Sequence, residues 1–197
     1  MYTRLRHEIN TLAIPLQLVY NLLLMIEVRK RRNGKVPASI SNYRIVPMDE
    51  HQAAEICEWR YDPPYNIYGW LPWEQMKALE VEFGSPTLRQ EQYVAVLDEE
   101  NELTGFAQYF PMVGVTRLGL GMHPERCGHG TGSDFVRAIA EEARRRHPQN
   151  EIDLEVLTWN QRAIRAYKAA GFELTDTYER QTPDGRKPFH CMVYRPE

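Results

Sequence analysis

Three glycines at alternate positions, Gly128, Gly130 and Gly132, form the stretch of this chain that is best suited to binding chemistry. Glycines leave backbone N–H groups unscreened and accept positive φ, so successive N–H groups can point at one anion. A helix is predicted directly afterwards, with Ser133 and Asp134 in its first turn. The unpaired N–H groups and the positive dipole end of a helix start also favour an anion. The stretch therefore predicts an anion site, and a plain surface turn is the alternative.

The glycine turn matches neither of the two common phosphate-binding loops. A Walker A loop needs Lys followed by Ser or Thr after the glycines, and that pair is absent here. The dinucleotide pattern G-x-G-x-x-G would need a third glycine where Ser133 stands. The turn alone therefore leaves the identity of the anion open.

Two further side chains have the chemistry to move protons. In the predicted strand Ile152–Leu157, Asp153 and Glu155 alternate with apolar residues, so the two acids face away from the apolar side. Tyr167 lies on the apolar side of the helix predicted to follow. A carboxylate can accept a proton if partial burial raises its pKa, and a phenol with a pKa near ~10 can donate one. The alternatives are a solvated strand glutamate and a core tyrosine.

Composition describes an ordinary globular chain. The 197 residues fit one domain with an appendage, and they are 43% hydrophobic and 26% charged. A net charge of −3 gives no electrostatic footprint for nucleic acid, so no nucleic-acid partner is expected. Cys57, Cys127 and Cys191 are widely spaced and form no metal-binding pattern. We therefore expect no metal, reduced thiols and a cytoplasmic location.

Residues 1–42 differ from the rest of the chain and are predicted to be a helical extension followed by a linker. Leu12–Val28 is strongly apolar, and a run of four basic residues follows it at 29–32. We favour an amphipathic helix that packs on the domain or forms a homodimer. Membrane contact by residues 12–28 is the second interpretation, since the length is near ~20 residues, but Pro15 and Glu27 interrupt the stretch. A signal peptide is third, because the basic run follows the apolar region.

The aromatic segment between residues 59 and 73 combines rings with prolines and a glycine, which argue against a regular element. Aromatic side chains on a loop combine large area with polar tips and so suit a substrate pocket. The candidates for substrate contact are Trp59, Tyr61, Tyr65 and Tyr68. The alternative is that these rings only cover the core.

The remaining pattern predicts a mixed α/β (α+β) domain over residues 43–197. Strands are predicted over Tyr43–Met48, Gln92–Leu97, Leu103–Phe110, Thr116–His123, Ile152–Leu157, Phe172–Glu179 and Phe189–Arg195. Helices are predicted from Asp49 to about Trp59 and over Glu74–Glu82, Ser133–Arg146 and Asn160–Ala170. This order of hairpins and βα units implies a central mixed sheet of about seven strands flanked by helices, with the extra N-terminal helix outside it.

Two blocks of this domain together resemble the GNAT superfamily of acyl-CoA N-acyltransferases. GMHPERCGHGTGS is similar to the superfamily's acyl-CoA motif, (Q/R)-x-x-G-x-(G/A) after a strand. LEVLTWNQRAIRAYKAAGF is similar to its second block, in which a strand, an Asn, a helix with a Tyr and Gly-Phe follow one another. The resemblance covers residues 43–197. One departure is Cys127, where the family has Gln or Arg; Arg126 is the neighbour that would compensate.

The resemblance implies acetyl-CoA as the cosubstrate. Its pyrophosphate would bind the glycine turn, and its pantetheine arm would pair with the strand before the turn where two strands splay apart. Carried over position by position, the expected contacts are Leu120, Gly121, Met122, Cys127, Gly128, His129, Gly130, Thr131, Gly132, Ser133, Asn160 and Tyr167.

The resemblance also implies the reaction, in which an amine attacks the thioester directly in a ternary complex. Tyr167 matches the family tyrosine near the sulfur and would protonate the thiolate. Glu155 and Tyr167, twelve residues apart, resemble the base and acid proposed for bacterial ribosomal-protein N-terminal alanine acetyltransferases. The expected acceptor is a primary amine on a small molecule or a peptide. The alternative function is a non-catalytic acyl-CoA-binding sensor with the same fold.

Overall fold

The computed structural model describes residues 42–196. The predicted N-terminal helix and its interpretations fall within residues 1–41 and so lie outside the described residues. From residue 42 onward, every helix is too short or too polar to cross a membrane.

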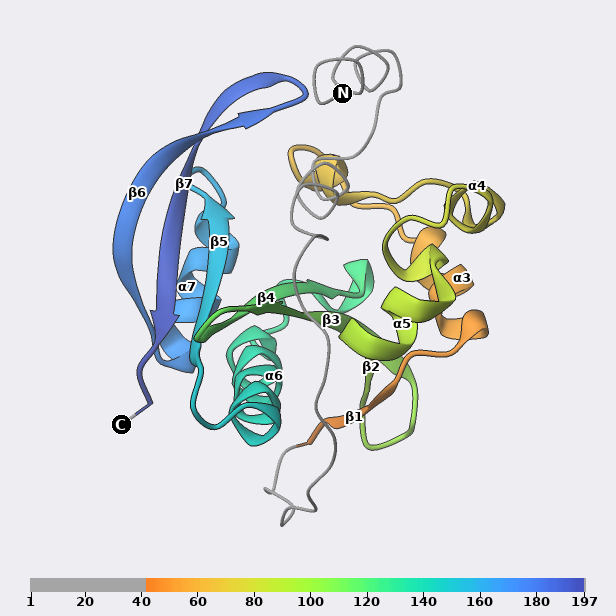
Figure 1. The fold of residues 1–197 in the computed structure, drawn as a ribbon, viewed down its shortest axis with the longest axis horizontal. Coiled ribbons are helices and arrows are strands. Elements are labelled where there is room, and N and C mark those ends of the chain that lie inside the picture. Colours follow the sequence, from red (N-terminus) through yellow and green to blue (C-terminus); the bar gives the residue numbers. More distant parts are fainter. Residues whose placement is uncertain (1–41, 197) are drawn as a thin grey trace.

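The domain is built on a seven-stranded sheet, which confirms the predicted sheet of about seven strands, and the strands lie in the order β1-β2-β3-β4-β5-β7-β6 (Figure 1). The strands are β1 Arg44–Pro47, β2 Tyr93–Leu97, β3 Leu103–Met112, β4 Val115–Met122, β5 Glu151–Leu157, β6 Phe172–Thr182 and β7 Gly185–Tyr194. Only the β4–β5 pair is parallel, and the other neighbours are antiparallel. The sheet is therefore mixed.

Within residues 42–196, five α-helices and three short 3₁₀ turns connect the strands. The helices are α3 Glu50–Cys57, α4 Trp73–Ala78, α5 Pro86–Gln92, α6 Gly132–Arg146 and α7 Gln161–Ala170. The 3₁₀ turns are η2 Tyr65–Tyr68, η3 Glu82–Gly84 and η4 Pro124–Arg126. The helix predicted over Glu74–Glu82 ends early, because Glu80 and Glu82 adopt positive φ, which a helix cannot contain. Helix α5 was not predicted, although Pro86 at its first turn is a typical start signal.

Strand alternation divides the core into two clusters on opposite faces of the sheet. Val94 and Val96 of β2 pack with α6 and α7 in one cluster, whereas Tyr93 packs with α3–α5 in the other. In Figure 1, α3, α4 and α5 accordingly gather near β1 and β2, and α6 and α7 lie beside β4 and β5. The α6–α7 cluster contains residues of every strand from β2 to β7, whereas the strand residues of the α3–α5 cluster come from β2 and β3.

The sheet opens between β4 and β5. The two strands pair only from Val115–Leu118 to Glu151–Leu154. Beyond that point β4 continues to Met122 with β3 as its partner, and β5 continues to Leu157 with β7 as its partner. The strands diverge in Figure 1, and backbone groups on their facing edges are left without strand partners.

Gly121, on the diverging part of β4, leaves room for a neighbouring ring. A β-carbon at Gly121 would lie 2.4 Å from the side chain of Phe106. We expect Gly121→Ala to lower the free energy of unfolding by about 1–3 kcal/mol, the usual cost of overpacking. Urea unfolding measures this loss of stability. The same substitution is also made in a Phe106→Leu background, where the smaller side chain leaves space for the added β-carbon. An equal cost of Gly121→Ala in both backgrounds would show that the ring is not the cause.

Candidate active site

A cavity of about 250 Å³ occupies the opening between β4 and β5. Gly119, Leu120 and Met122 line it from β4, and Glu155 and Leu157 line it from β5. The same cavity reaches the glycine turn, α7 and the η2 segment, whose residues also line it. The structure thus joins in one pocket most of the regions that the sequence singled out.

The glycine turn is an open backbone cradle at one end of this pocket. Gly128 and Gly130 have φ of +87° and +85°, and a β-carbon at either would project into open space. The turn leads into α6, which begins at Gly132 rather than at Ser133 as predicted. Thr131 precedes α6 without a side-chain cap, so its hydroxyl does not occupy the first-turn N–H groups. This geometry suits an anion such as a phosphate.

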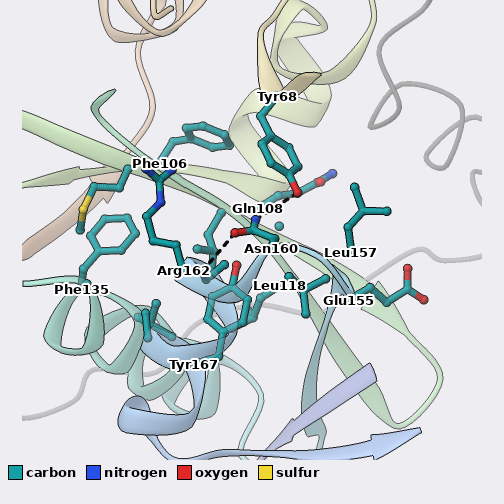
Figure 2. Close-up of a pocket in the computed structure, with 18 of the residues that line it drawn as sticks. Tyr68, Phe106, Gln108, Leu118, Phe135, Glu155, Leu157, Asn160, Arg162 and Tyr167 are labelled. Atoms are coloured by element: carbon teal, nitrogen blue, oxygen red, sulfur yellow. Dashed lines mark hydrogen bonds between the residues drawn. The ribbon is translucent and has the colours of Figure 1, made fainter. Parts of the chain in front are cut away.

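Asn160 connects α7 to the η2 segment (Figure 2). Its side-chain oxygen accepts a hydrogen bond from the Ala163 N–H at 3.2 Å and so caps the helix. Its amide nitrogen donates to the Tyr68 hydroxyl oxygen at 3.1 Å. Only 7% of Asn160 is exposed. One buried side chain therefore holds both the start of α7 and one wall of the pocket.

Tyr167 lines the pocket from the inner side of α7. Figure 2 shows its hydroxyl pointing toward the part of the pocket where Asn160 and Tyr68 lie. Burial raises the pKa of Tyr167, nearby Tyr68 raises it further, and Arg162 opposes the shift. The phenol is consequently protonated throughout the physiological pH range and can serve as a proton donor.

Glu155 lines the pocket from β5, and its carboxylate is fully engaged. Arg117 and Arg180 form ion pairs with it, and the Tyr178 hydroxyl donates a hydrogen bond to it. Only 8% of its side chain is exposed, so it is not a solvated strand glutamate. In Figure 2 it points away from Tyr167. A role as proton acceptor therefore requires the incoming amine to displace one of these partners.

Two of the four predicted substrate contacts line the pocket, namely Tyr61 and Tyr68. The Tyr61 hydroxyl also donates to the Met122 carbonyl at 2.9 Å, which ties its loop to the end of β4. Tyr65 lies beside the pocket wall, where Arg162 stacks over its ring at 3.8 Å. Trp59 contradicts the prediction. It is only 5% exposed and belongs to the core.

The reason for the error at Trp59 is its position directly after α3. Its ring lies 6.1 Å from that of Phe106 and 5.0 Å from that of His123, measured between centroids. The chain turns away from the core only after this residue. The burial of an aromatic side chain cannot be predicted from its position in a proline-rich segment alone.

Three arginines at the pocket were not singled out from the sequence: Arg117, Arg162 and Arg180. A signal was available for Arg117, since it interrupts an otherwise uncharged strand. Its guanidinium also pairs with Asp153, with Nε–Oδ1 at 2.9 Å. No local pattern indicated that Arg180, on another strand, would meet Glu155.

Cys127 stands at the pocket end of the glycine turn as a thiol. Its sulfur lies 3.7 Å from the Met122 carbonyl oxygen, and burial raises its pKa. Such a thiol is a poor nucleophile. The guanidinium of the adjacent Arg126 pairs with Asp98 at 2.9 Å. His129 is exposed.

Within residues 42–196, no three metal-ligating side chains come together.

A pocket at a split in a mixed sheet, with a glycine turn leading into a helix, defines an α/β transferase domain. The model of the family described as "Acetyltransferase (GNAT) family" matches residues 50–172, which is more than half of the chain. The chain belongs to this acetyltransferase family.

Solved structures share the fold at low sequence identity. A GNAT acetyltransferase from Bacillus anthracis has a TM-score of 0.65 at 13% identity, over 78% of this chain and 94% of that one. AAC(6')-Ib in complex with ribostamycin and coenzyme A has a TM-score of 0.56 at 23% identity, over 78% and 93%. The ribosomal-protein-S18-alanine N-acetyltransferase of Escherichia coli has a TM-score of 0.53 at 19% identity, over 77% and 92%. No curated protein sequence matches the chain significantly.

Removing the side chain of Asn160 should weaken the structure at two places. Asn160→Ala deletes the α7 cap, which typically costs about 0.5–2 kcal/mol, and also the bond to Tyr68. Tyr68→Phe is the matched control, since it deletes the second bond and retains the cap. Urea unfolding should show a larger loss for Asn160→Ala than for Tyr68→Phe. Equal losses would mean that the cap contributes nothing.

Proposed function

We propose that this protein transfers an acetyl group from acetyl-CoA to a primary amine, by direct attack of the amine in a ternary complex. The observation that carries the proposal is the continuous pocket, which joins the glycine cradle, Tyr167 and Glu155 across the opening of the sheet. Family membership supports the same class of reaction.

The residues present fit acetyl-CoA, which supplies the acetyl group as a thioester. In the proposal, the cradle of Gly128–Gly132 and the start of α6 bind the pyrophosphate. The edge of β4 from Leu120 to Met122, which has no partner on the β5 side, pairs with the amides of the pantetheine arm. AAC(6')-Ib, which shares the fold, binds coenzyme A and acetyl-CoA.

Tyr167 is the proposed general acid. As the carbon–sulfur bond breaks, its hydroxyl gives a proton to the sulfur. The raised pKa keeps the proton on the phenol before the reaction but also makes the phenol a weaker acid, so the proton moves only as negative charge develops on the sulfur.

Glu155 is the proposed general base, acting after an exchange of partners. An ammonium group that replaces Arg180 at the carboxylate would keep the charge balance and could then lose its proton to Glu155. Attack by the resulting neutral amine on the thioester carbonyl forms the carbon–nitrogen bond, and the carbon–sulfur bond breaks as the sulfur takes the proton of Tyr167. The nitrogen then loses its second proton, which restores the Tyr167 hydroxyl and leaves the amide.

The second candidate is an acyl-CoA-binding module without turnover. Cys127 in place of the family's Gln or Arg favours it, and so does the engagement of Glu155 with two guanidinium groups. One measurement separates the two candidates. Protein that binds acetyl-CoA should form an N-acetylated amine if it is an enzyme and none if it is a binding module.

The glycine cradle gives the first test. We expect Gly130→Val to weaken acetyl-CoA binding at least about 10-fold, or about 1.4 kcal/mol, because the side chain would fill the cradle and strain the positive φ. Gly114→Val is the control, since Gly114 has φ of +73° in the β3–β4 turn and equally open space. Titration calorimetry should show normal binding in the control. Normal binding in both variants would remove the glycine turn from the site.

Tyr167 gives the second test. Tyr167→Phe should lower kcat by about 10²-fold with little change in acetyl-CoA affinity. Because the pKa of Tyr167 is raised above its ordinary value of 10, loss of the proton should not reduce kcat below about pH 10. Initial rates from pH 6 to 10 measure both effects. A wild-type rate in the variant across this range would rule out the acid role.

A further inference from the structure

The pocket has a second half, on the face of the sheet opposite α6 and α7. Directly paired residues of antiparallel strands share a face. Phe110 pairs with Arg117, and Leu157 pairs with Phe189. Leu118 packs in the α6–α7 cluster, so its neighbour Arg117 faces the other way. We call this side the acceptor half, a name that rests on the proposed function.

Large apolar side chains dominate the acceptor half. Those that line it are Trp70, Tyr93, Phe106, Phe110, Leu157 and Phe189. Several are fixed by one another: the Trp70 ring lies 5.7 Å from that of Phe106, with an edge-to-face angle of 66°. Because these rings already hold one another in place, they lose little conformational entropy when the apolar body of a ligand packs against them.

The charges at the pocket are unsuited to a ligand with several positive charges. Among the described lining residues, the cations are Arg117, Arg162 and Arg180, and the single anion is Glu155. Glu155 is already paired with two of these cations. Arg117 also pairs with Asp153, so these three cations and two acids leave one net positive charge. A second ammonium group on the ligand would therefore meet a positive pocket whose lining acid is already paired.

The size of the cavity limits the body of the acceptor. At about 250 Å³ it lies below the range of about 300–1,000 Å³ typical of ligand pockets. In the proposed function the acetyl group and part of the pantetheine arm also occupy this volume, because Leu120 and Met122 line it. The remaining space suits a body of about one ring.

From these observations we infer that the acceptor is a small monoamine with an apolar body of about one ring, and not a polyamine or an aminosugar. The acceptor class thus differs from the substrates of two proteins that share the fold, which are a spermidine N-acetyltransferase and a protein crystallised with ribostamycin.

A matched pair of amines isolates the effect of charge. Butylamine and 1,4-diaminobutane share a carbon frame and differ by one ammonium group. With saturating acetyl-CoA, kcat/KM for butylamine should exceed that for the diamine at least about 10-fold, and 2-phenylethylamine should exceed butylamine because of the aromatic wall. Spermidine and ribostamycin should be the poorest acceptors. A diamine as good as butylamine would overturn the inference.

Two variants test whether the pocket charges set this preference. Gln108→Glu adds an acid of nearly equal size on the acceptor half, and Arg180→Gln removes a cation from Glu155. Each should reduce the butylamine-to-diamine ratio by about 5- to 10-fold. Gln90→Glu, on the exposed side of α5, is the control and should leave the ratio unchanged. An unchanged ratio in both pocket variants, with circular dichroism and acetyl-CoA affinity normal, would overturn the inference.

Calorimetric titration with acetyl-CoA separates this inference from the proposed function. If the wild-type protein is folded but does not bind acetyl-CoA, the proposed function fails, and the inference fails with it. If it binds acetyl-CoA and acetylates diamines or a peptide N-terminus but none of the monoamines, only the inference fails. Binding together with acetylation of the monoamines supports both.

Discussion

The structure depends on where the pairing between β4 and β5 stops. Four residues of each strand hold the two halves of the sheet together, and beyond Leu118 and Leu154 they separate. The cost is a set of backbone groups without strand partners, which in a stable sheet would be paired. The α6–α7 core cluster makes the separation sustainable, since it packs against strands on both sides of the opening. The opening supplies both the pocket and a strand edge for a ligand.

The charged group around Glu155 depends on this opening. Asp153, Glu155, Arg117 and Arg180 come from three strands and are largely buried, so each must have a partner. Buried ion pairs of this kind contribute little net stability relative to apolar residues of equal size, but breaking one is expensive.

Local patterns in the sequence predicted much of this arrangement. The alternation in Ile152–Leu157 placed Glu155 opposite the core face, and the glycines predicted a turn into a helix; the structure confirms both. Contacts between distant strands were beyond local patterns, because the partners of Glu155 follow from register, which short motifs do not encode. Local patterns also did not predict how deeply a side chain is buried, as Trp59 shows. Helix α5 was missed because PTLRQEQ lacks an apolar period.

The two hydrogen bonds of Asn160 link one wall of the pocket to the helix that carries Tyr167. Tyr68 belongs to the η2 segment at the rim of the pocket, and Tyr167 belongs to the helix that Asn160 caps. A ligand that displaces the η2 segment would therefore also alter the start of α7. A ligand that stabilises α7 would likewise stabilise the rim of the pocket. By thermodynamic linkage the two occupants alter each other's affinity by the same factor. In the proposed function, these two hydrogen bonds of Asn160 would couple the binding of acetyl-CoA to the binding of the amine.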